Sequence, residues 1–553
     1  MYIEDTDHAL YTKESWASDG SGKTPNSLVV VSFPNAFRIA LTQGPDLPIN
    51  DNEEGSLGNY MTAIKETDQA VLDMDSAGNT ANILKAQSST ESAAGYCDAF
   101  TFPDGTTKGV LPALGWWQIA YNRKSDVDAC LQACGGDAIT YLENYQWSST
   151  YWGTDAGGEY MWQKDWERGG KNSNGLLWAS SVRPFAEYPL ADTIVIDQTD
   201  NDPFTRVSGD VAGDVITWIR SNSHRVLAKR TADGEVTFCR LDDTDSTKYH
   251  DGTTAALDGT EGDVFMKMPT FYYSGTEGDT VRMTFSVNPY AGCVKWDGNT
   301  LIGAYEAYNN SSKMYSRSGV ASTGKISQST WKTYAAARGT GYQLVDWQMH
   351  CVMGCLYYAM YGNTNCQNSI GKGVSSYDKT CGQTDSLGMT DTVAGGNGDS
   401  QSINYWGLEN WWGNKYEWIH DYDNPANSLS ATVNDPVNGG TRSLPIFNYG
   451  GYYPKKMKFG RYLDLIATTD DPKNGSNTVG YCDYQWWPGS TKSEPRVVLR
   501  SFYSSNTGGG VAYAYAVNTA SYTGSNFGSR LAFRGSLVEA ENVSAFKALS
   551  VTN

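Results

Sequence analysis

The chain has 553 residues, enough for roughly two to four domains, and its 40% hydrophobic and 19% charged residues are typical of a globular protein rather than a disordered one. Its formal net charge is −19 and it has no run of basic residues. That balance excludes nucleic acid as a main partner and disfavours an anionic membrane surface. No apolar run of about twenty residues predicts a membrane-spanning helix.

The N-terminus begins MYIEDTDH, which is polar and lacks the apolar core of a signal peptide. We therefore expect synthesis in a cytosol, no membrane insertion, and release by a route other than secretion. Ten cysteines are scattered without a CxxC pair, and the chain has five histidines. The ligand spacing of a zinc site is missing, so we expect buried free thiols and no metal centre.

Residues 1–190 are predicted to form an N-terminal β-rich region. Leu28–Phe33, LVVVSF, is typical of a buried strand, with a turn at Pro34 and a partner strand over residues 37–41. Ser125 is a predicted N-cap for a short helix that Gly135 ends. The order Leu-Pro, helix, Trp-Ser-Ser-Thr, Val-Arg-Pro within residues 99–187 resembles small bacterial and phage modules of the C-type lectin fold.

Residues 191–300 are predicted to form a β-rich middle domain of strands between Asp/Gly turns. The strand over residues 264–273 contains Pro269, which marks an edge or a bulge because proline cannot donate to a strand ladder. This run resembles a segment common in phage tail proteins, and an ordinary β-domain is the equal alternative.

Residues 301–553 are the most informative part of the chain. Ser327 is a predicted N-cap for a helix that ends at Gly339, and Asp346 is one for a Met-rich helix that ends at Gly362. The stretch Trp411–Trp418, WWGNKYEW, places four aromatic residues around a Gly413-Asn414 turn. Gly and Asn tolerate the positive φ of a tight turn, so we expect this turn to be packed into a core.

Four motifs follow one another in this region: Gly341-Tyr-Gln-Leu, Gly413-Asn-Lys-Tyr-Glu-Trp, Arg496-Val-Val-Leu-Arg and Gly528-Ser-Arg-Leu-Ala-Phe-Arg-Gly. Their order resembles the formylglycine-generating-enzyme-like branch of the C-type lectin fold, and within it phage tail receptor-binding proteins and retroelement-diversified variable proteins. The chain departs from the family pattern at Gln343 and Val345, where the family has Arg and Pro. The resemblance implies an α+β, β-rich multidomain chain with C-type-lectin-like modules made of short antiparallel strands, two helices and long ordered loops.

Enzymes of this branch use cysteine thiols near the C-terminal end. Here Cys482 is the last cysteine and no histidine follows His420, so we expect no enzyme, no catalytic residue and no cofactor. The calcium triplets of lectins are also missing, although a structural Ca²⁺ on the acidic loops stays open. Asp421 and Asp423 resemble a glycosidase pair, and we favour a solvated loop instead.

The sequence is compatible with three alternative functions. The first is a host-receptor-binding protein of a phage tail tip or tail fibre, which would contact a cell-surface glycan or protein and other tail proteins. By analogy with fibres we expect a homo-oligomer, with a trimer as the guess. The second is an oxidase- or hydrolase-type enzyme on the same fold, and the third is a bacterial surface adhesin, which the missing signal peptide disfavours.

The predicted ligand surface lies between Arg500 and Arg530, where Tyr, Ser and Asn replace the Val, Ile and Leu of a core strand. Paratopes use this mixture, because Tyr supplies a large contact area and Ser and Asn supply adaptable hydrogen bonds. In the diversified relatives the variable stretch lies at this place, which implies that Arg500, Arg530 and Arg534 form a fixed scaffold. The predicted receptor-binding residues are Tyr503, Ser504, Asn506, Tyr513, Tyr515, Asn518, Tyr522 and Asn526.

Overall fold

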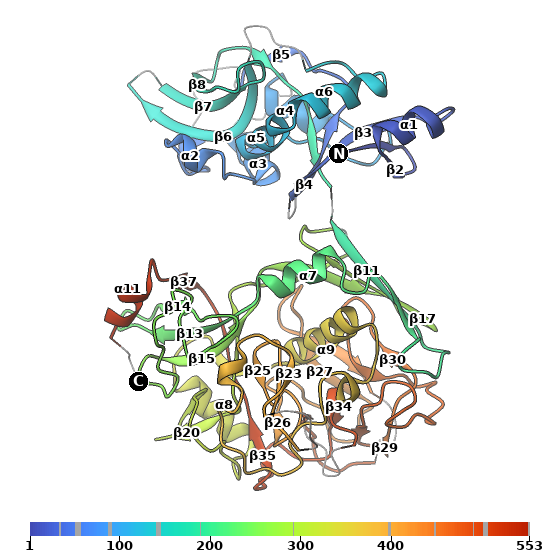
Figure 1. Ribbon diagram of the computed structural model, residues 1–553, viewed down its shortest axis with the longest axis vertical. Coiled ribbons are helices and arrows are strands. Elements are labelled where there is room, and N and C mark those ends of the chain that lie inside the picture. The colour runs from blue at the N-terminus through green and yellow to red at the C-terminus, as the bar shows by residue number, and fades with distance from the viewer. Residues whose placement is uncertain are drawn as a thin grey trace. The chain divides into compact units, whose positions relative to one another are not determined.

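The computed structural model describes residues 1–32, 35–49, 57–86, 91–139, 145–156, 158–188, 190–290, 292–395, 400–446, 450–489, 491–501 and 507–550. Contacts divide the chain into two compact units, Met1–Leu190 and Ala191–Asn553 (Figure 1). Each unit combines helices with mainly antiparallel sheets, so the chain is α+β, as the sequence predicts. The assignment of lectin-like modules within it stays a prediction.

The first unit contains two five-stranded sheets, in the orders β10-β4-β3-β1-β2 and β5-β9-β6-β7-β8. The strands of the first are β1 (Tyr2–Asp5), β2 (Leu10–Tyr11), β3 (Pro25–Ser32), β4 (Asn35–Ala40) and β10 (Phe185–Glu187). Those of the second are β5 (Asp46–Leu47), β6 (Tyr145–Asp155), β7 (Gly158–Asp165), β8 (Lys171–Gly175) and β9 (Ser180–Ser181). Its helices are α1 (Lys13–Asp19), α2 (Thr67–Ala70), α3 (Ser76–Ala86), α4 (Ala93–Ala99), α5 (Leu114–Asn122) and α6 (Lys124–Ala133).

The predicted strand pair at the start of this unit is confirmed, because β3 and β4 pair antiparallel with Val30 opposite Phe37. Both side chains enter a buried cluster with Trp117. The predicted cap at Ser125 is wrong. Helix α6 begins one residue earlier, and Ser125 is an exposed residue inside its first turn.

Three larger sheets build the second unit, in the orders β12-β11-β17-β16-β18, β22-β36-β19-β15-β13-β14-β37 and β29-β32-β34-β33-β26-β35. The first contains β11 (Ala191–Asp197), β12 (Val207–Gly209), β16 (Phe271–Gly275), β17 (Thr280–Ser286) and β18 (Val294–Trp296). The second contains β13 (His224–Arg230), β14 (Val236–Arg240), β15 (Asp263–Lys267), β19 (Thr300–Gly303), β22 (Tyr342–Leu344), β36 (Leu531–Arg534) and β37 (Leu537–Glu539). The third contains β26 (Tyr416–Trp418), β29 (Gly450–Tyr452), β32 (Gln485–Trp487), β33 (Leu499–Ser501), β34 (Gly510–Tyr515) and β35 (Phe527–Ser529).

Short strand pairs and helices complete this unit. The short strands are β20 (Tyr308–Asn310), β21 (Lys313–Tyr315), β23 (Thr392–Val393), β24 (Ile403–Tyr405), β25 (Leu408–Glu409), β27 (Ser430–Asn434), β28 (Thr441–Pro445), β30 (Met457–Lys458) and β31 (Ile466–Ala467). The helices are α7 (Asp214–Ser221), α8 (Gln328–Ala336), α9 (Trp347–Tyr361), α10 (Cys366–Ser369) and α11 (Val543–Ala548). No helix of the described ranges is both long and apolar enough to span a bilayer.

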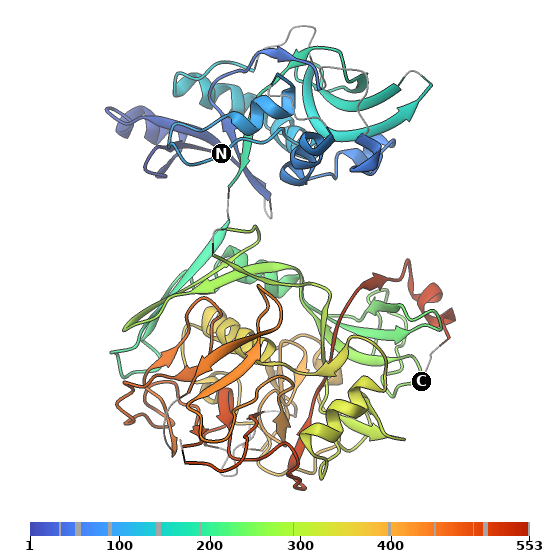
Figure 2. The same ribbon diagram turned by 180° about the vertical axis from the view of Figure 1, so that it is seen from behind.

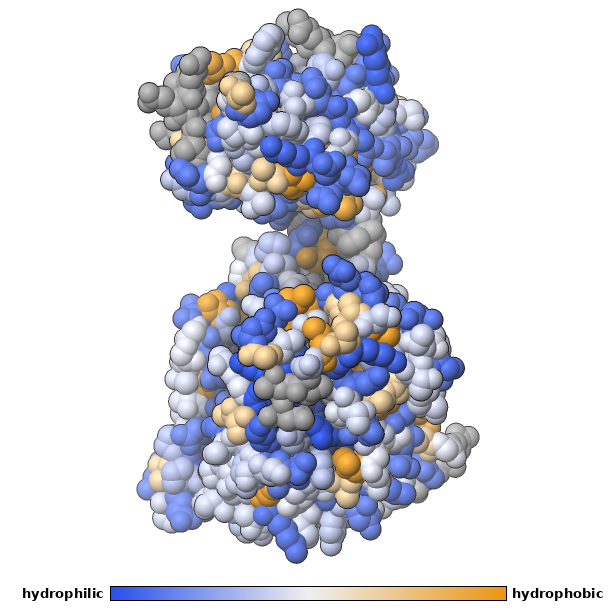
Figure 3. Space-filling model, turned by 90° about the vertical axis from the view of Figure 1, so that its left-hand side faces the viewer, coloured by the Kyte–Doolittle hydropathy of each residue, from blue (hydrophilic) through white to orange (hydrophobic). Residues whose placement is uncertain are grey.

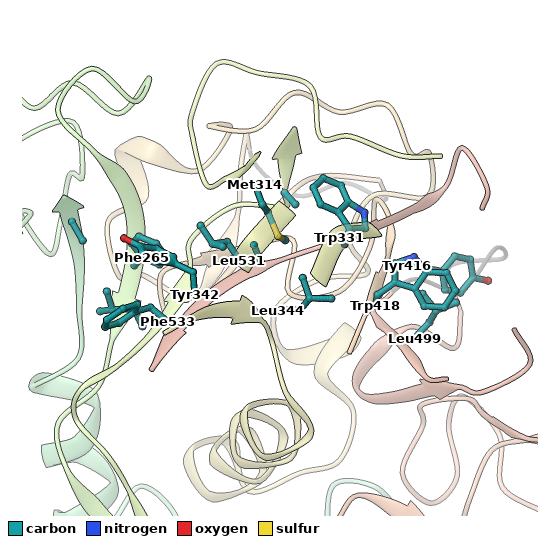
Figure 4. Close-up of a cluster of buried hydrophobic side chains, with 14 of the residues drawn as sticks. Phe265, Met314, Trp331, Tyr342, Leu344, Tyr416, Trp418, Leu499, Leu531 and Phe533 are labelled. Atoms are coloured by element: carbon teal, nitrogen blue, oxygen red, sulfur yellow. The ribbon is translucent and has the colours of Figure 1, made fainter. Parts of the chain in front are cut away.

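The boundary that the sequence predicts at residue 300 falls inside strand β19, which pairs with β15 on one side and with β36 on the other. Residues on both sides of that boundary therefore share one sheet. They also share one core, in which Phe265 from β15 lies near Phe533 from β36, and Trp331 from α8 lies near Trp418 from β26 (Figure 4). Residues 191–300 and 301–553 thus belong to a single compact unit.

Helix α9 lies inside the second unit, with strands around it in both views (Figures 1 and 2). The predicted caps of this helix are confirmed. The Asp346 side chain accepts a hydrogen bond from the Met349 amide, and Gly362 ends the helix with a φ of +63°. The N-cap at Ser327 is confirmed in the same way, because its hydroxyl accepts from the Thr330 amide at the start of α8.

Candidate ligand-binding face

The turn at Gly413-Asn414 comes directly before strand β26 of the third sheet of the second unit. Both residues have positive φ, +89° and +59°, as the sequence predicts for this dipeptide. The Asn414 side-chain amide donates to the buried Glu306 carboxylate, and the Lys415 amide donates to the same carboxylate over 3.0 Å. Burial raises the pKa of Glu306 to about 7. These contacts fix the direction in which strand β26 leaves the turn.

A buried ion triad joins three segments beneath this sheet. Glu417 of β26 pairs with Arg500 of β33 and with Arg530, whose Nη2 lies 2.7 Å from Glu417 Oε1, and all three side chains are fully buried. Arg530 also donates to the carbonyls of Gly303 and Ala304, each over 2.9 Å. Because every one of these contacts is internal, the two arginines are structural and do not face a ligand.

Arg534 also forms an ion pair that joins two elements, away from the ion triad. Its Nε lies 2.7 Å from Asp346 Oδ2, so it ties strand β36 to the N-terminus of α9. Asp421 meets the same helix end, since its carboxylate accepts from the Trp347 amide over 2.8 Å. The solvated-loop interpretation of Asp421 is therefore wrong, whereas Asp423 is exposed. Asp421 is thus a second carboxylate at the N-terminus of α9, beside the N-cap Asp346.

On the opposite side of the sheet five aromatic rings form a continuous line, here called the aromatic row: Trp486, Tyr515, Tyr416, Phe527 and Tyr522. Successive ring centroids lie 5.4, 5.7, 5.0 and 5.3 Å apart. These separations are typical of packed aromatic pairs. Tyr416 and Phe527 are buried, Trp486 and Tyr515 are half-buried, and Tyr522 keeps 48% of its surface exposed.

An open hollow of about 590 Å³, here called the aromatic hollow, lies at the Trp486 end of this row. It is lined by Gly450, Gly451, Tyr484, Trp486, Trp487, Gly489, Thr491 and Tyr515. Strand register explains its shape, because Gly451 of β29 stands opposite Trp486 of β32, which in turn stands opposite Tyr515 of β34. The missing side chain at Gly451 makes room for the ring of Tyr484, which lies against the backbone of β29.

The structure separates the predicted receptor-binding residues into three groups. Tyr503, Ser504 and Asn506 lie outside the described residues. Tyr515, Asn518, Tyr522 and Asn526 retain accessible surface. Tyr513 does not: its side chain is fully buried in the cluster that contains Trp331 and Tyr416, so its assignment to the contact surface is wrong.

Tyr484, Trp486 and the Gly450-Gly451 pair were not predicted from the sequence. The only signal for them is the aromatic density of residues 484–487, YQWW. Their closeness to Tyr515 depends on the parallel pairing of β32 with β34, which no local pattern indicates. The molecular face drawn in Figure 3 is mainly hydrophilic, with apolar residues in small groups.

A metal centre has no support within the described ranges, where no group of three or more His, Cys, Asp and Glu side chains is placed to hold an ion. The expectation that the protein has no cofactor stays a prediction.

The solved structures that are similar to the chain include the following two. One is titled "Major Tropism Determinant I1 Variant", with 13% identity, 56% of this chain and 72% of the other covered, and a TM-score of 0.22. The second is titled "Major Tropism Determinant U1 Variant", with 14% identity, the same coverage, and a TM-score of 0.23. No protein-family model and no curated protein matches the chain. At these TM-scores the two likenesses carry no argument about this chain.

Proposed function

We propose that the chain is a non-enzymatic, receptor-binding protein of a phage tail, and that the face carrying the aromatic row recognises a ligand on the host cell surface. The observation that carries the proposal is the row itself. Its middle rings are packed into the core, while ring surface stays accessible at Trp486 and Tyr515 on one end and at Tyr522 on the other. A rigid row of this kind offers contact area with little side-chain entropy to lose.

The scaffold beneath the row fits a display function. Glu417, Arg500 and Arg530 hold strands β26 and β33 and the end of β35 through contacts that involve no surface residue. Substitution of accessible residues such as Asn518 and Asn526 would therefore leave the ion triad in place. The four sequence motifs also meet here, since β22 pairs with β36, and β26 pairs with β33 and β35. This arrangement supports the proposed formylglycine-generating-enzyme-like domain.

An oxidase on the same scaffold is not favoured. Burial raises the thiol pKa of Cys351, Cys355 and Cys381 well above its usual range. A thiol that stays protonated is a poor nucleophile and a poor metal ligand. Asp421, one of the two suggested hydrolytic carboxylates, accepts a hydrogen bond from the first amide of α9 instead.

The proposal places the protein at the tail tip or in a tail fibre of the virion, in contact with other tail proteins through its first unit. A homotrimer is the proposed assembly, by analogy with fibres. A host cell-surface glycan or protein is the proposed ligand of the second unit.

The test combines imaging with cell binding. Particles labelled with an antibody against the chain should carry the label on the tail in electron micrographs. The purified, fluorescently labelled chain should bind some bacterial strains of a panel and not others, and it should compete with particles for the strains that it binds. Label on the capsid alone, or binding to no strain that the particles infect, would contradict the proposal.

A further inference from the structure

We propose that the aromatic hollow is a binding site for an uncharged saccharide, which stacks on Trp486 and Tyr515. This inference rests on the proposed receptor-binding function and names the ligand class for one end of the aromatic row. The hollow measures about 590 Å³. That volume lies within the range of ligand sites in proteins.

The floor of the hollow depends on a glycine. A Cβ placed on Gly451 would lie 1.6 Å from the Tyr484 hydroxyl oxygen and 2.3 Å from the adjacent ring carbon. Tyr484 therefore lies against a backbone with no side chain, and a second ring, that of Tyr453, packs against it at 5.4 Å. Because Gly451 stands opposite Trp486, β29 places no side chain beside the Trp486 ring at that position.

Two aromatic rings of the hollow lie side by side. The centroids of Trp486 and Tyr515 lie 5.4 Å apart with the planes tilted by 43°. The lining also includes three residues whose side chains carry hydroxyl groups, Tyr484, Tyr515 and Thr491. A sugar ring has the matching chemistry, with one apolar C–H face and hydroxyl groups at its edge.

The charges of the lining residues and of the whole chain determine which class of saccharide fits the hollow. Among the described residues, none that lines the hollow is charged, although the chain as a whole has a formal net charge of −19. A sialylated, uronic or phosphorylated glycan would find no cationic partner in the hollow and would be repelled by the net charge of the protein. A charged peptide would likewise leave its ionic groups without partners. The hollow therefore selects a neutral ligand.

The experiment uses the full chain on an array of neutral hexose and N-acetylhexosamine oligosaccharides printed beside sialylated, uronic and phosphorylated ones. The strongest neutral hit is then titrated by saturation-transfer NMR. We expect Trp486→Ala to weaken binding at least about tenfold and Trp486→Phe to restore most of it, because a ring remains for stacking. Gly451→Ala should also weaken binding, since Tyr484 must move.

The control is Tyr60→Ala in the first unit, which removes a ring with 47% of its surface exposed and should leave saccharide binding unchanged. Melting temperatures of all variants show whether the second unit stays folded. Binding of acidic glycans alone, binding of no glycan, or neutral binding that Trp486→Ala and Gly451→Ala leave intact would each overturn the proposal. Cell binding that survives Trp486→Ala but is lost in Tyr522→Ala would also overturn it, while the receptor-binding function would stand.

Discussion

At Glu417 two guanidinium groups share one buried carboxylate, and this residue fixes the geometry of the third sheet. We predict that Glu417→Gln lowers the free energy of unfolding of the second unit by about 3–5 kcal/mol, because two arginines stay buried without a full counter-charge. Chemical denaturation of the full chain measures the change. The control is Glu494→Gln, which breaks a 3.3 Å pair between Arg496 and a carboxylate side chain that is 64% exposed, and it should cost about 1 kcal/mol or less. Equal losses in the two variants would contradict the prediction.

Asp483 gives a prediction about pH. Burial raises the pKa of this carboxyl to about 8, and the carboxylate accepts a hydrogen bond from the Ala512 amide over 2.8 Å. The folded state therefore holds the proton more tightly than the unfolded state does, so the contribution of Asp483 to stability falls as the pH rises from about 4 to about 8. Asp483→Asn removes this dependence. The melting temperature of the variant relative to the parent should increase between pH 5 and pH 8, and a pH-independent difference would contradict the assignment.

The sequence around a residue does not predict whether a distant segment of the chain covers its side chain. Strand alternation places Tyr513 and Tyr515 on the same face of β34, and the composition of the stretch indicates a surface for both. The two differ because Tyr513 lies within the cluster that contains Trp331 of α8, whereas Tyr515 lies at its edge. No local pattern specifies which of two equivalent tyrosines a distant helix will cover.

Helix ends were the best predicted elements, because a capping side chain and a left-handed glycine are both local signals. Ser327, Asp346 and Gly362 act as predicted, and Ser125 does not. Sheet order was beyond prediction, since the third sheet joins strands from residues 416 to 529 in an order unrelated to the sequence. The aromatic hollow depends on that order, and so it was missed.

The two serines give a matched test at the element scale. Ser327→Ala should lower the free energy of unfolding of the second unit by about 1 kcal/mol, because the Thr330 amide loses its acceptor. Ser125→Ala should leave the first unit unchanged or slightly more stable, since alanine is the better helix former at an exposed helical position. Two equal losses would show that Ser125 also caps its helix.

The pairing of strands determines which residues form the second compact unit, and the composition of the chain does not predict it. The residue pattern of 191–300 differs from that of 301–553, and the sequence therefore predicts two domains. Strands β13, β14 and β15 nevertheless pair with strands from the C-terminal part, and Val226, Phe238 and Phe265 fill the same core as Trp418. Pairing between strands so far apart in the sequence cannot be predicted from a short stretch of residues.

Truncation tests this boundary. A fragment of residues 191–553 should unfold cooperatively with the melting temperature of the second unit in the full chain. A fragment of residues 301–553 should not fold, because it lacks three strands of the seven-stranded sheet and their core side chains. Circular dichroism and denaturation curves separate the outcomes. A cooperative transition in the shorter fragment would restore a domain boundary at residue 300.

Binding of whole host cells by Tyr522→Ala tests recognition through the aromatic row. Tyr522 ends the aromatic row with 48% of its surface exposed, and Tyr60 in the first unit is a matched control with 47% exposed. Truncating a contact tyrosine typically costs about 1–4 kcal/mol of binding free energy. We predict that Tyr522→Ala lowers cell binding at least about fivefold at an unchanged melting temperature, while Tyr60→Ala binds like the parent. Full binding by Tyr522→Ala, or an equal loss in Tyr60→Ala, would contradict recognition through this face.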